Sequence, residues 1–345
     1  MSDMLAGELP RGADQVSVGA SPWALARRRL LRNRTAMAML GVLVLIVLLC
    51  LAAPFYAHHV AHTDPFESNL DGTTIVDGKR VPVMQESSSG LGLGVTPIGP
   101  TWDPEHYFLG ADNQGRDVAA RLLYGGRNSL LIGSAAALLA CLLGTLVGLA
   151  AGFFGGSVDG VLSRALDVVW AFPVYLLAIC LSTVLLTRGL SFGPFRLEAG
   201  SLLLPIAIIG IVYVPYAARS IRGEALALRE REFVEAAVGL GASNWRLLWS
   251  DFLPNVVTTV IVLLPLLIAI AMLTESALSF LSIGVQPPDA SWGTIILDGQ
   301  GLLYTRPAVA IAPGIAIAIT VLALNVLGDG IRDALDPRAK VRLPH

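Results

Sequence analysis

Long runs of apolar residues alternate along this chain with three polar segments. Six stretches carry no charged side chain, and each is about as long as the roughly 20 residues that a helix needs to cross a bilayer. They are residues 37–57, 128–154, 168–187, 199–218, 252–274 (continuing past Glu275 to residue 284) and 307–328. None shows the two-residue alternation of a membrane β-barrel. The pattern predicts an all-α polytopic membrane protein with six transmembrane helices.

The first apolar run could be read as a cleaved signal peptide, because five arginines between positions 27 and 34 precede it. The run is too long for that, however, and Pro54, Phe55 and Tyr56 follow it in place of a small-residue cleavage site. We therefore expect a basic tail over residues 1–35 and an uncleaved first span over residues 36–57. The arginines are expected to orient the span and to contact anionic lipid.

The distribution of lysine and arginine predicts the orientation. With six spans, 16 of the 24 basic residues fall on the side that holds both ends of the chain. Because basic loops stay in the cytoplasm, both termini are expected there, in a cell membrane. The predicted divisions are then an extracytoplasmic region over residues 58–127, a core of five spans over residues 128–330 and a cytoplasmic tail over residues 331–345.

Composition agrees with this picture. Hydrophobic residues make up 54% of the chain and charged residues only 14%, against about 25% charged in a soluble domain. The three cysteines, Cys50, Cys141 and Cys180, lie inside apolar runs and predict no disulfide framework. They are expected to be packing residues.

The cytoplasmic loop over residues 219–254 stands out, because 10 of the 33 residues from 219 to 251 are charged. Good helix formers without proline run from Glu224 to Leu240, and Gly241 is suited to end a helix. Ser243 or Asn244 can cap a second short helix, and Pro254 marks the entry to the next span. We predict two short helices that meet at a glycine corner.

One face of the first short helix is apolar, because Phe233, Ala236, Ala237 and Leu240 recur at helical spacing. A small apolar knob with a charged rim suits docking into a groove of a partner protein. The alternative is an ordinary amphipathic helix that lies on the membrane surface.

The loop also resembles a known motif. Glu235-Ala236-Ala237, Gly241 and Leu253-Pro254 are similar to the EAA loop of permease subunits in binding-protein-dependent ABC importers. In that family the loop is the coupling helix that inserts into the ATPase subunit. Asp251 stands where the general pattern has isoleucine, and Phe252 is expected to supply the apolar contact instead.

Three further segments resemble the dipeptide, oligopeptide and nickel branch of that family. They are residues 109–130, residues 275–293 and the run Gly328-Asp329-Gly330 that continues to Arg338. The similarity covers roughly residues 22–56 and 104–338. Residues 58–103 match nothing in the family and are expected to form an external insertion between the first two spans.

The resemblance implies a type I ABC importer permease fold and a transport function. The chain would translocate short peptides, or alternatively nickel or another small solute, delivered by an extracytoplasmic substrate-binding protein. Its implied partners are a second, homologous permease and two ATP-binding subunits, which would bind ATP and magnesium. The residues expected to couple the chain to the ATPase are Arg231, Glu232, Phe233, Glu235, Ala236, Ala237, Leu240, Gly241, Trp245 and Arg246.

This chain carries no nucleotide-binding signature of its own. A P-loop requires a lysine after glycine and before serine or threonine, and the only lysines are Lys79 and Lys340. We therefore expect no enzyme activity, no cofactor and no nucleic-acid partner.

Gly144, Gly148 and Gly152 form a repeated small-residue pattern on the second span. Such a pattern lets two helices pack closely, within the bundle or against a second permease. Glu275 is costly in lipid, so we expect it, with Ser276 and Ser279, either to line the translocation pathway or to act as a structural acceptor of hydrogen bonds.

His58, His59 and His62 are a weak candidate for a metal site, and no metal is expected. Arg164 and Asp167, three residues apart, are expected to form an ion pair at a helix edge.

Two other functions remain open at this stage. A stand-alone channel or ion-driven carrier would usually place ionisable side chains in several spans, and only Glu275 does so clearly. A purely structural membrane scaffold is compatible with the composition but leaves the cytoplasmic knob unexplained.

Overall fold

The computed structural model describes residues 22–76, 78–86, 94–188, 190–192, 195–197 and 200–336. Most of this part of the chain is helical. The helices are α1 (Pro22–Arg32), α2 (Arg34–Leu51), α3 (Ala53–His59), α4 (Val118–Phe154), α5 (Gly156–Trp170), α6 (Val174–Arg188), α7 (Leu203–Val212), α8 (Val214–Arg229), α9 (Glu232–Gly239), α10 (Asn244–Leu247), α11 (Leu253–Phe280), α12 (Trp292–Gly299) and α13 (Ala308–Leu335), with a π-helical turn η1 (Leu248–Phe252) and a 3₁₀ turn η2 (Gln300–Leu302).

Three short antiparallel hairpins accompany the helices. They pair β1 (Thr73–Val76) with β2 (Lys79–Pro82), β3 (Met84–Glu86) with β4 (Val95–Pro97), and β5 (Leu190–Phe192) with β6 (Phe195–Leu197). In β1–β2, Thr73 lies opposite Pro82. The sequence did not predict these strands, which lie outside the long apolar runs.

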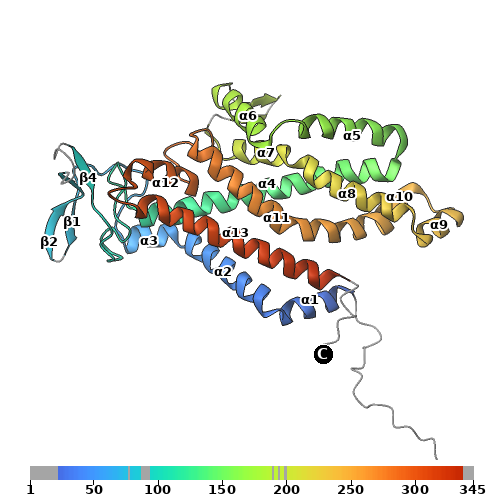
Figure 1. The fold of residues 1–345 in the computed structure, drawn as a ribbon, viewed down its shortest axis with the longest axis horizontal. Coiled ribbons are helices and arrows are strands. Elements are labelled where there is room, and N and C mark those ends of the chain that lie inside the picture. The colour runs from blue at the N-terminus through green and yellow to red at the C-terminus, as the bar shows by residue number, and fades with distance from the viewer. Residues whose placement is uncertain are drawn as a thin grey trace, which may run out of the picture.

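The long helices run roughly along one axis of the molecule (Figure 1). The first two hairpins lie at one end, the β end, and α9 projects from the opposite end, the α9 end (Figure 1). Helices α2, α4, α8, α11 and α13 form the body between them.

Four of the six predicted spans correspond to single helical segments, and the other two correspond to bent helix pairs. The helices α2, α4 and α13 and the continuous segment Asn244–Phe280 are each long and apolar enough to cross a bilayer alone. Two bent pairs, α5–α6 and α7–α8, raise the number to six if each pair is one span. This count refers to the described residues.

The predicted third span over residues 168–187 is wrong as a straight helix. The chain bends by 84° between α5 and α6. Pro173 explains the break, because a proline disfavours helical backbone in the residue before it and lacks the N–H of the helical ladder. The fourth predicted span begins at residue 199, outside the described residues. It bends by 43° between α7 and α8, where Pro215 lies in the first turn of α8.

The predicted ends of the other spans also shift. The first long helix stops at Leu51, and α3 continues as a separate short helix. The second begins ten residues earlier than predicted, at Val118, because the Asp117 side chain caps it by accepting a hydrogen bond from the Ala120 amide at 2.9 Å. A left-handed Gly155 (φ 64°) ends it.

Two apolar clusters hold the bundle together. The larger joins α4, α7, α8 and α11 and contains Ile132, Ile209, Ile221 and Leu267, all fully buried. The second joins α2, α4, α11, α12 and α13 around Trp292. Helices α4 and α11 contribute to both clusters and are therefore the central elements of the fold.

The segment between α3 and α4 forms its own small apolar cluster at the β end, from Val83, Ile98, Tyr107 and Ala111. It is tied to the helices by hydrogen bonds to main-chain oxygens: Arg121 donates to Pro65 at 2.9 Å, and Tyr56 donates to Pro104 at 3.1 Å. Arg306, in the turn before α13, donates to Pro97 at 2.5 Å. The segment over residues 58–103 thus rests on the turn that leads into α13.

Helix α1 and the end of α13 lie side by side toward the α9 end (Figure 1). Arg29 donates to the main-chain oxygen of Asp336 at 3.1 Å. Both ends of the described chain therefore lie at one end of the bundle. The remainder of the predicted tails, residues 1–21 and 337–345, lies outside the described residues.

Candidate functional site

The segment between α8 and α11, residues 230–252, forms a protrusion that we call the α9 loop. Helix α9 is anchored to the bundle by Val234, which is buried in the larger apolar cluster. At the other end of the loop, Phe252 is fully buried and contacts Phe153 of α4 edge-to-face, with ring centroids 4.9 Å apart. The loop is thus fixed at both ends and exposed between them.

Gly241 makes the corner between the two short helices, as predicted. Its φ of 82° is left-handed, and its amide donates to the Val238 carbonyl at 2.9 Å. The Ser243 side chain then caps α10 by accepting from the Arg246 amide at 3.3 Å.

The first predicted helix is not continuous from residue 224 to residue 240. It breaks at Glu230 and Arg231, where Arg231 is extended (φ −84°, ψ 136°) and α9 begins anew. Helix propensity alone favours no break here, and the burial of Val234 against the bundle sets the new direction. Tertiary packing overrides local propensity at this point.

Large apolar side chains of the α9 loop point away from the bundle. Leu240 is 90% exposed, Trp245 66% and Phe233 47%. The Trp245 and Trp249 rings contact each other edge-to-face at 5.5 Å, so the aromatic surface continues from α10 into η1. A contiguous exposed apolar surface of this kind marks an interaction site rather than a solvated loop.

The charged residues predicted for this surface surround the apolar side chains. Arg231, Glu232, Glu235 and Arg246 are exposed, as is Ala236, whereas Ala237 is half-buried. These four charged side chains form no ion pair within the described part of the chain. Between α9 and α4 lies a cavity of 580 Å³, with Glu235 on one side and Phe153 and Phe154 on the other. All of the predicted coupling residues except Ala237 are thus exposed on the α9 loop, and their role stays a prediction.

The glycine pattern of the second span lies against α8 of the same chain. A Cβ atom at Gly144 would overlap Ala217, one at Gly148 would overlap the Ala218 carbonyl, and one at Gly152 would overlap Ala225. The three glycines let the two helix backbones approach closely. The contact within the bundle is therefore the one that this structure contains.

Glu275 is fully buried between helices, where three serine hydroxyls surround it. Its carboxylate accepts hydrogen bonds from Ser129 of α4 at 2.9 Å, from Ser279 at 2.7 Å and from Ser276 at 3.4 Å. Two of these hydroxyls in turn accept from main-chain amides: Ser129 from Trp292 at 3.1 Å and Ser279 from Val285 at 3.0 Å.

This arrangement fixes the direction of the hydrogen bonds. Because the two hydroxyls accept from amides, their own protons are free to point at Glu275, which acts as the common acceptor. The network joins α4, α11, α12 and the loop before α12. The geometry favours the structural reading of Glu275, Ser276 and Ser279; a pathway role for them stays a prediction.

A cluster of four charged residues at the β end was missed by the sequence reasoning. Asp112 accepts from the Arg116 Nε at 2.7 Å, and Asp298 of α12 accepts from Arg116 at 2.9 Å and from Arg121 at 3.0 Å. We call Asp112, Arg116, Arg121 and Asp298 the outer charge cluster. It pins the start of α4 to α12, and the buried charges compensate one another.

Burial raises the pKa of Asp298, and the neighbouring guanidinium groups of Arg121 and Arg116 oppose that rise. The acidic and basic residues of 112–117 were visible in the sequence, but nothing in the pattern indicated a partner on α12.

Two other pairs connect α5 to α8. Arg222 binds Asp159, with one contact at 2.7 Å, and Arg219 binds Asp167 at 2.7 Å. The predicted pair between Arg164 and Asp167 is therefore wrong, because Asp167 binds Arg219 of α8 rather than Arg164 in the preceding turn of its own helix.

The histidine and cysteine expectations can be compared directly with the structure. Helix α3 ends at His59, and His62 has a left-handed φ of 49°, so His58 and His62 do not share a helical face. Among the described residues no three histidine, cysteine or acidic side chains gather as a metal site. Cys50 and Cys141 are buried, Cys180 is exposed, and none is in a disulfide.

The fold and the protrusion together define a class: a polytopic helical membrane protein with an exposed aromatic loop at one end. Comparison with known proteins identifies the family. The profile of the binding-protein-dependent transport system inner membrane component family matches residues 144–341, and that of the N-terminal transmembrane domain of oligopeptide transport permease C matches residues 21–71.

Relatives of similar length align over nearly the whole chain. The prediction that residues 58–103 match nothing in the family is therefore wrong, because the permease C profile already reaches residue 71 and the relatives cover 93–96% of the chain. The oligopeptide transport system permease protein OppC of Escherichia coli is 37% identical, covering 93% of this chain and 92% of the relative. The glutathione permease GsiD of Pectobacterium atrosepticum is 34% identical over the same shares. The dipeptide permease DppC of Alkalihalophilus pseudofirmus is 33% identical, covering 96% of this chain and 94% of the relative.

A solved structure shares the fold. The MetNI methionine ABC transporter, solved in inward-facing conformations, matches with a TM-score of 0.50 and 17% identity, covering 63% of this chain and 96% of the matched chain. The chain belongs to the family of binding-protein-dependent transport system inner membrane components. The predicted type I ABC importer permease fold is confirmed.

Proposed function

We propose that this chain is a permease subunit of an ATP-driven importer of short peptides. A substrate-binding protein delivers the cargo at the β end, and two ATP-binding subunits hydrolyse ATP, with magnesium, at the α9 end. A second, homologous permease completes the pathway. The relatives named for oligopeptides, dipeptides and glutathione support peptide-like cargo; nickel or another small solute is the alternative.

One observation carries this proposal. The α9 loop exposes Phe233 on α9, Leu240 just after it and Trp245 on α10, between anchors at Val234 and Phe252 that are buried in the bundle. A rigid lever with an apolar tip fits a groove on another protein better than it fits a lipid surface, because its rim carries acidic groups as well as basic ones. In this proposal the lever seats in the ATPase subunit and transmits its closure to α8 and α11.

The orientation follows from the same proposal. The α9 end faces the cytoplasm, and so do α1 and the end of α13, which lie at that end (Figure 1). The arginines of α1 are then on the cytoplasmic side, as the positive-inside rule requires. Both chain termini are cytoplasmic in this arrangement.

The experiment compares two glycines of the same loop. Gly241→Ala places a side chain on left-handed backbone, whereas Gly239→Ala does so on ordinary helical backbone, and neither Cβ would meet another atom. In the complete complex in proteoliposomes, Gly241→Ala is expected to separate ATP hydrolysis from peptide uptake, while Gly239→Ala keeps both.

A second pair tests the acidic rim. Glu235→Arg on α9 should uncouple the complex, and Glu230→Arg, just outside the helix, should not. Normal uptake in both Gly241→Ala and Glu235→Arg, with normal amounts of protein in the membrane, would refute the proposal that the α9 loop couples this chain to the ATPase subunit.

A further inference from the structure

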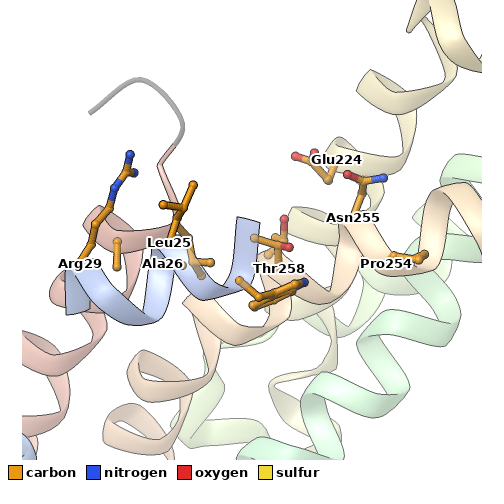
Figure 2. Close-up of a pocket in the computed structure, with 11 residues that line it drawn as sticks. Leu25, Ala26, Arg29, Glu224, Pro254, Asn255 and Thr258 are labelled. Atoms are coloured by element: carbon orange, nitrogen blue, oxygen red, sulfur yellow. The ribbon is translucent and has the colours of Figure 1, made fainter. Parts of the chain in front are cut away.

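The described chain contains a cavity of 640 Å³ near the α9 end, enclosed by α1, α8, α11 and α13. Leu25, Ala26 and Arg29 lie on α1, on one side of it, and Glu224, Asn255 and Thr258 lie on α8 and α11, on the other (Figure 2). A second cavity of 440 Å³ shares Thr258 and Thr259 with the first and adds Ser220. The two therefore follow each other along α11.

Polar side chains line this space at helical spacing. On α11, Asn255, Thr258 and Thr259 are three and four residues apart, so they share one face. On α8, Ser220 and Glu224 are four residues apart and share another. Two polar faces from neighbouring helices thus border one continuous space.

The hydroxyl groups of Thr258 and Thr259 lack hydrogen-bond partners in the described part of the chain. Other threonines in long helices behave differently: Thr145, Thr274 and Thr320 donate to a carbonyl one turn earlier at 2.6 to 2.9 Å. Polar groups at membrane depth that the protein leaves unsatisfied must face water or a polar ligand.

Glu224 is the acidic side chain that lines the first cavity, and Arg332 and Asp333 also line the second. Glu224 is half-buried and forms no ion pair with any described residue. Across the cavity, the guanidinium group of Arg29 donates to the Asp336 main-chain oxygen. The cavity thus has a carboxylate on one side and a cation on the other, which suits a small molecule that carries both an ammonium and a carboxylate group.

The other polar group of α11 is satisfied by the protein itself. Glu275 and Ser279 are fully buried and hydrogen-bonded to one another and to neighbouring elements. A cavity of 550 Å³ at the β end reaches Ser279, but Glu275 does not line it.

We propose that this cavity is this chain's half of the cytoplasmic vestibule, through which the cargo leaves the transporter. Ser220, Asn255, Thr258 and Thr259 supply polar contacts, and Glu224 attracts the ammonium group of the departing peptide. The inference rests on the proposed function and assigns wall residues to the pathway. A phospholipid headgroup is the competing occupant, and the experiment separates the two.

The test uses thiol labelling in the complete complex. Cys50, Cys141 and Cys180 are first replaced by alanine or serine, and Thr258→Cys is introduced. The complex is reconstituted with its cytoplasmic side outward. Cationic and anionic membrane-impermeant methanethiosulfonates are applied, with and without millimolar trialanine loaded through the binding protein and ATP. Leu146→Cys, exposed on α4 and outside both cavities, is the control for a lipid-facing position.

We expect labelling at residue 258 and none at residue 146. Turnover with trialanine should slow the labelling several-fold. The cationic reagent should react about fivefold faster than the anionic one, because a nearby carboxylate attracts it, and Glu224→Gln should abolish this preference. Thr259→Cys provides a second position if Thr258→Cys assembles poorly.

Absence of labelling at residues 258 and 259, or labelling whose rate trialanine leaves unchanged, would overturn the proposal that cargo leaves through this cavity. Labelling that responds to removal of anionic lipid but not to trialanine would assign the cavity to lipid and also overturn it. Peptide uptake and binding-protein-stimulated ATP hydrolysis, measured on the unlabelled parent complex, test the proposed function separately. If peptide uptake and ATP hydrolysis persist while trialanine does not protect residue 258, the vestibule assignment is wrong but the proposed function stands.

Discussion

Ser129 on α4 donates a 2.9 Å hydrogen bond to Glu275 on α11, 146 residues further along the chain. Ser129 also accepts from the Trp292 amide at 3.1 Å, so one hydroxyl links three helices. Glu275 completes this link only as an acceptor.

Glu275→Gln should therefore destabilise the protein. An amide group replaces one acceptor oxygen by a donor, and a buried donor then faces a serine proton. Such a mismatch costs about 1–3 kcal/mol. We expect a lower melting temperature in detergent, measured by the fluorescence of buried tryptophan. Glu230→Gln, an exposed carboxylate near α9, is the matched control and should change nothing.

The transport activity of Glu275→Gln separates the two roles of this residue. If the role is structural, each correctly assembled complex should transport normally at low temperature despite the reduced stability. A wild-type melting temperature combined with lost transport would contradict the structural reading and favour the pathway.

The long apolar runs were sufficient to predict where the chain crosses the bilayer, because hydrocarbon leaves the backbone few alternatives to a helix. The apolar runs could not predict whether the helix within each run is straight or bent. The run over residues 168–187 is as apolar as the others, yet Pro173 turns its second half by 84°. Hydropathy carries no information about such a bend, although the proline itself was visible.

In the α9 loop too, local features could be predicted from the sequence and features set by tertiary packing could not. The glycine corner at Gly241 and a cap at Ser243 or Asn244 were predicted because both are local features, and the structure shows Ser243 as the cap. The break before α9 was not predicted, because it depends on where Val234 finds a buried place in the bundle. The outer charge cluster was missed for a similar reason: Arg121 and Asp298 are 177 residues apart, and no local pattern pairs them.

The close packing of α4 against α8 at Gly144, Gly148 and Gly152 predicts a steric effect. Gly148→Ala places a Cβ against the Ala218 carbonyl, an atom that cannot move without shifting α8. We expect a loss of about 1–3 kcal/mol of stability, as for other overpacked cores, and failure to assemble for Gly148→Leu. Thermal unfolding and the amount of protein in the membrane measure the two effects.

Gly41→Ala on α2 is the control for Gly148→Ala, because nothing lies within 4 Å of a Cβ atom added at Gly41. It should be neutral or slightly stabilising, since alanine favours a helix over glycine. A Gly148→Ala variant that is stabilised to the same extent as Gly41→Ala would show that helix propensity, not close approach, governs these positions.

Asp117, which caps α4 outside the apolar spans, predicts a pH dependence. Burial raises the pKa of Asp117 to about 6, and one of its carboxylate oxygens lacks a partner among the described residues. The folded protein therefore holds this proton more tightly than the unfolded chain. Its ionisation should reduce stability progressively between about pH 4 and pH 6, by about 3 kcal/mol in total.

Asp117→Asn should retain the cap and lose this titration. We expect the fall in melting temperature from pH 5 to pH 7 to be smaller in the variant than in the wild type. Asp71→Asn, which removes an exposed carboxylate at the same end of the molecule, should leave the fall unchanged. Equal slopes in Asp117→Asn and the wild type would show that this carboxyl group titrates as it does in water.

The outer charge cluster predicts that the β end loosens when one charge is removed. Asp298→Asn removes the carboxylate charge that Arg116 and Arg121 share, and leaves Asp112 as the remaining carboxylate beside both. Breaking a fully buried pair costs about 3–5 kcal/mol, and we expect a smaller loss here because the amide oxygen of asparagine still accepts. Arg121→Ala removes one donor to Asp298 and also the contact with the Pro65 carbonyl. Faster cleavage of residues 60–117 by a protease added at the β end of the reconstituted complex should report both changes.

Because Arg121 and Asp298 act on each other, the double variant should be less impaired than the sum of the single ones. Arg127→Ala, on the same helix but exposed and outside the cluster, should be cleaved like the wild type; strictly additive effects would mean that the two residues anchor this end independently.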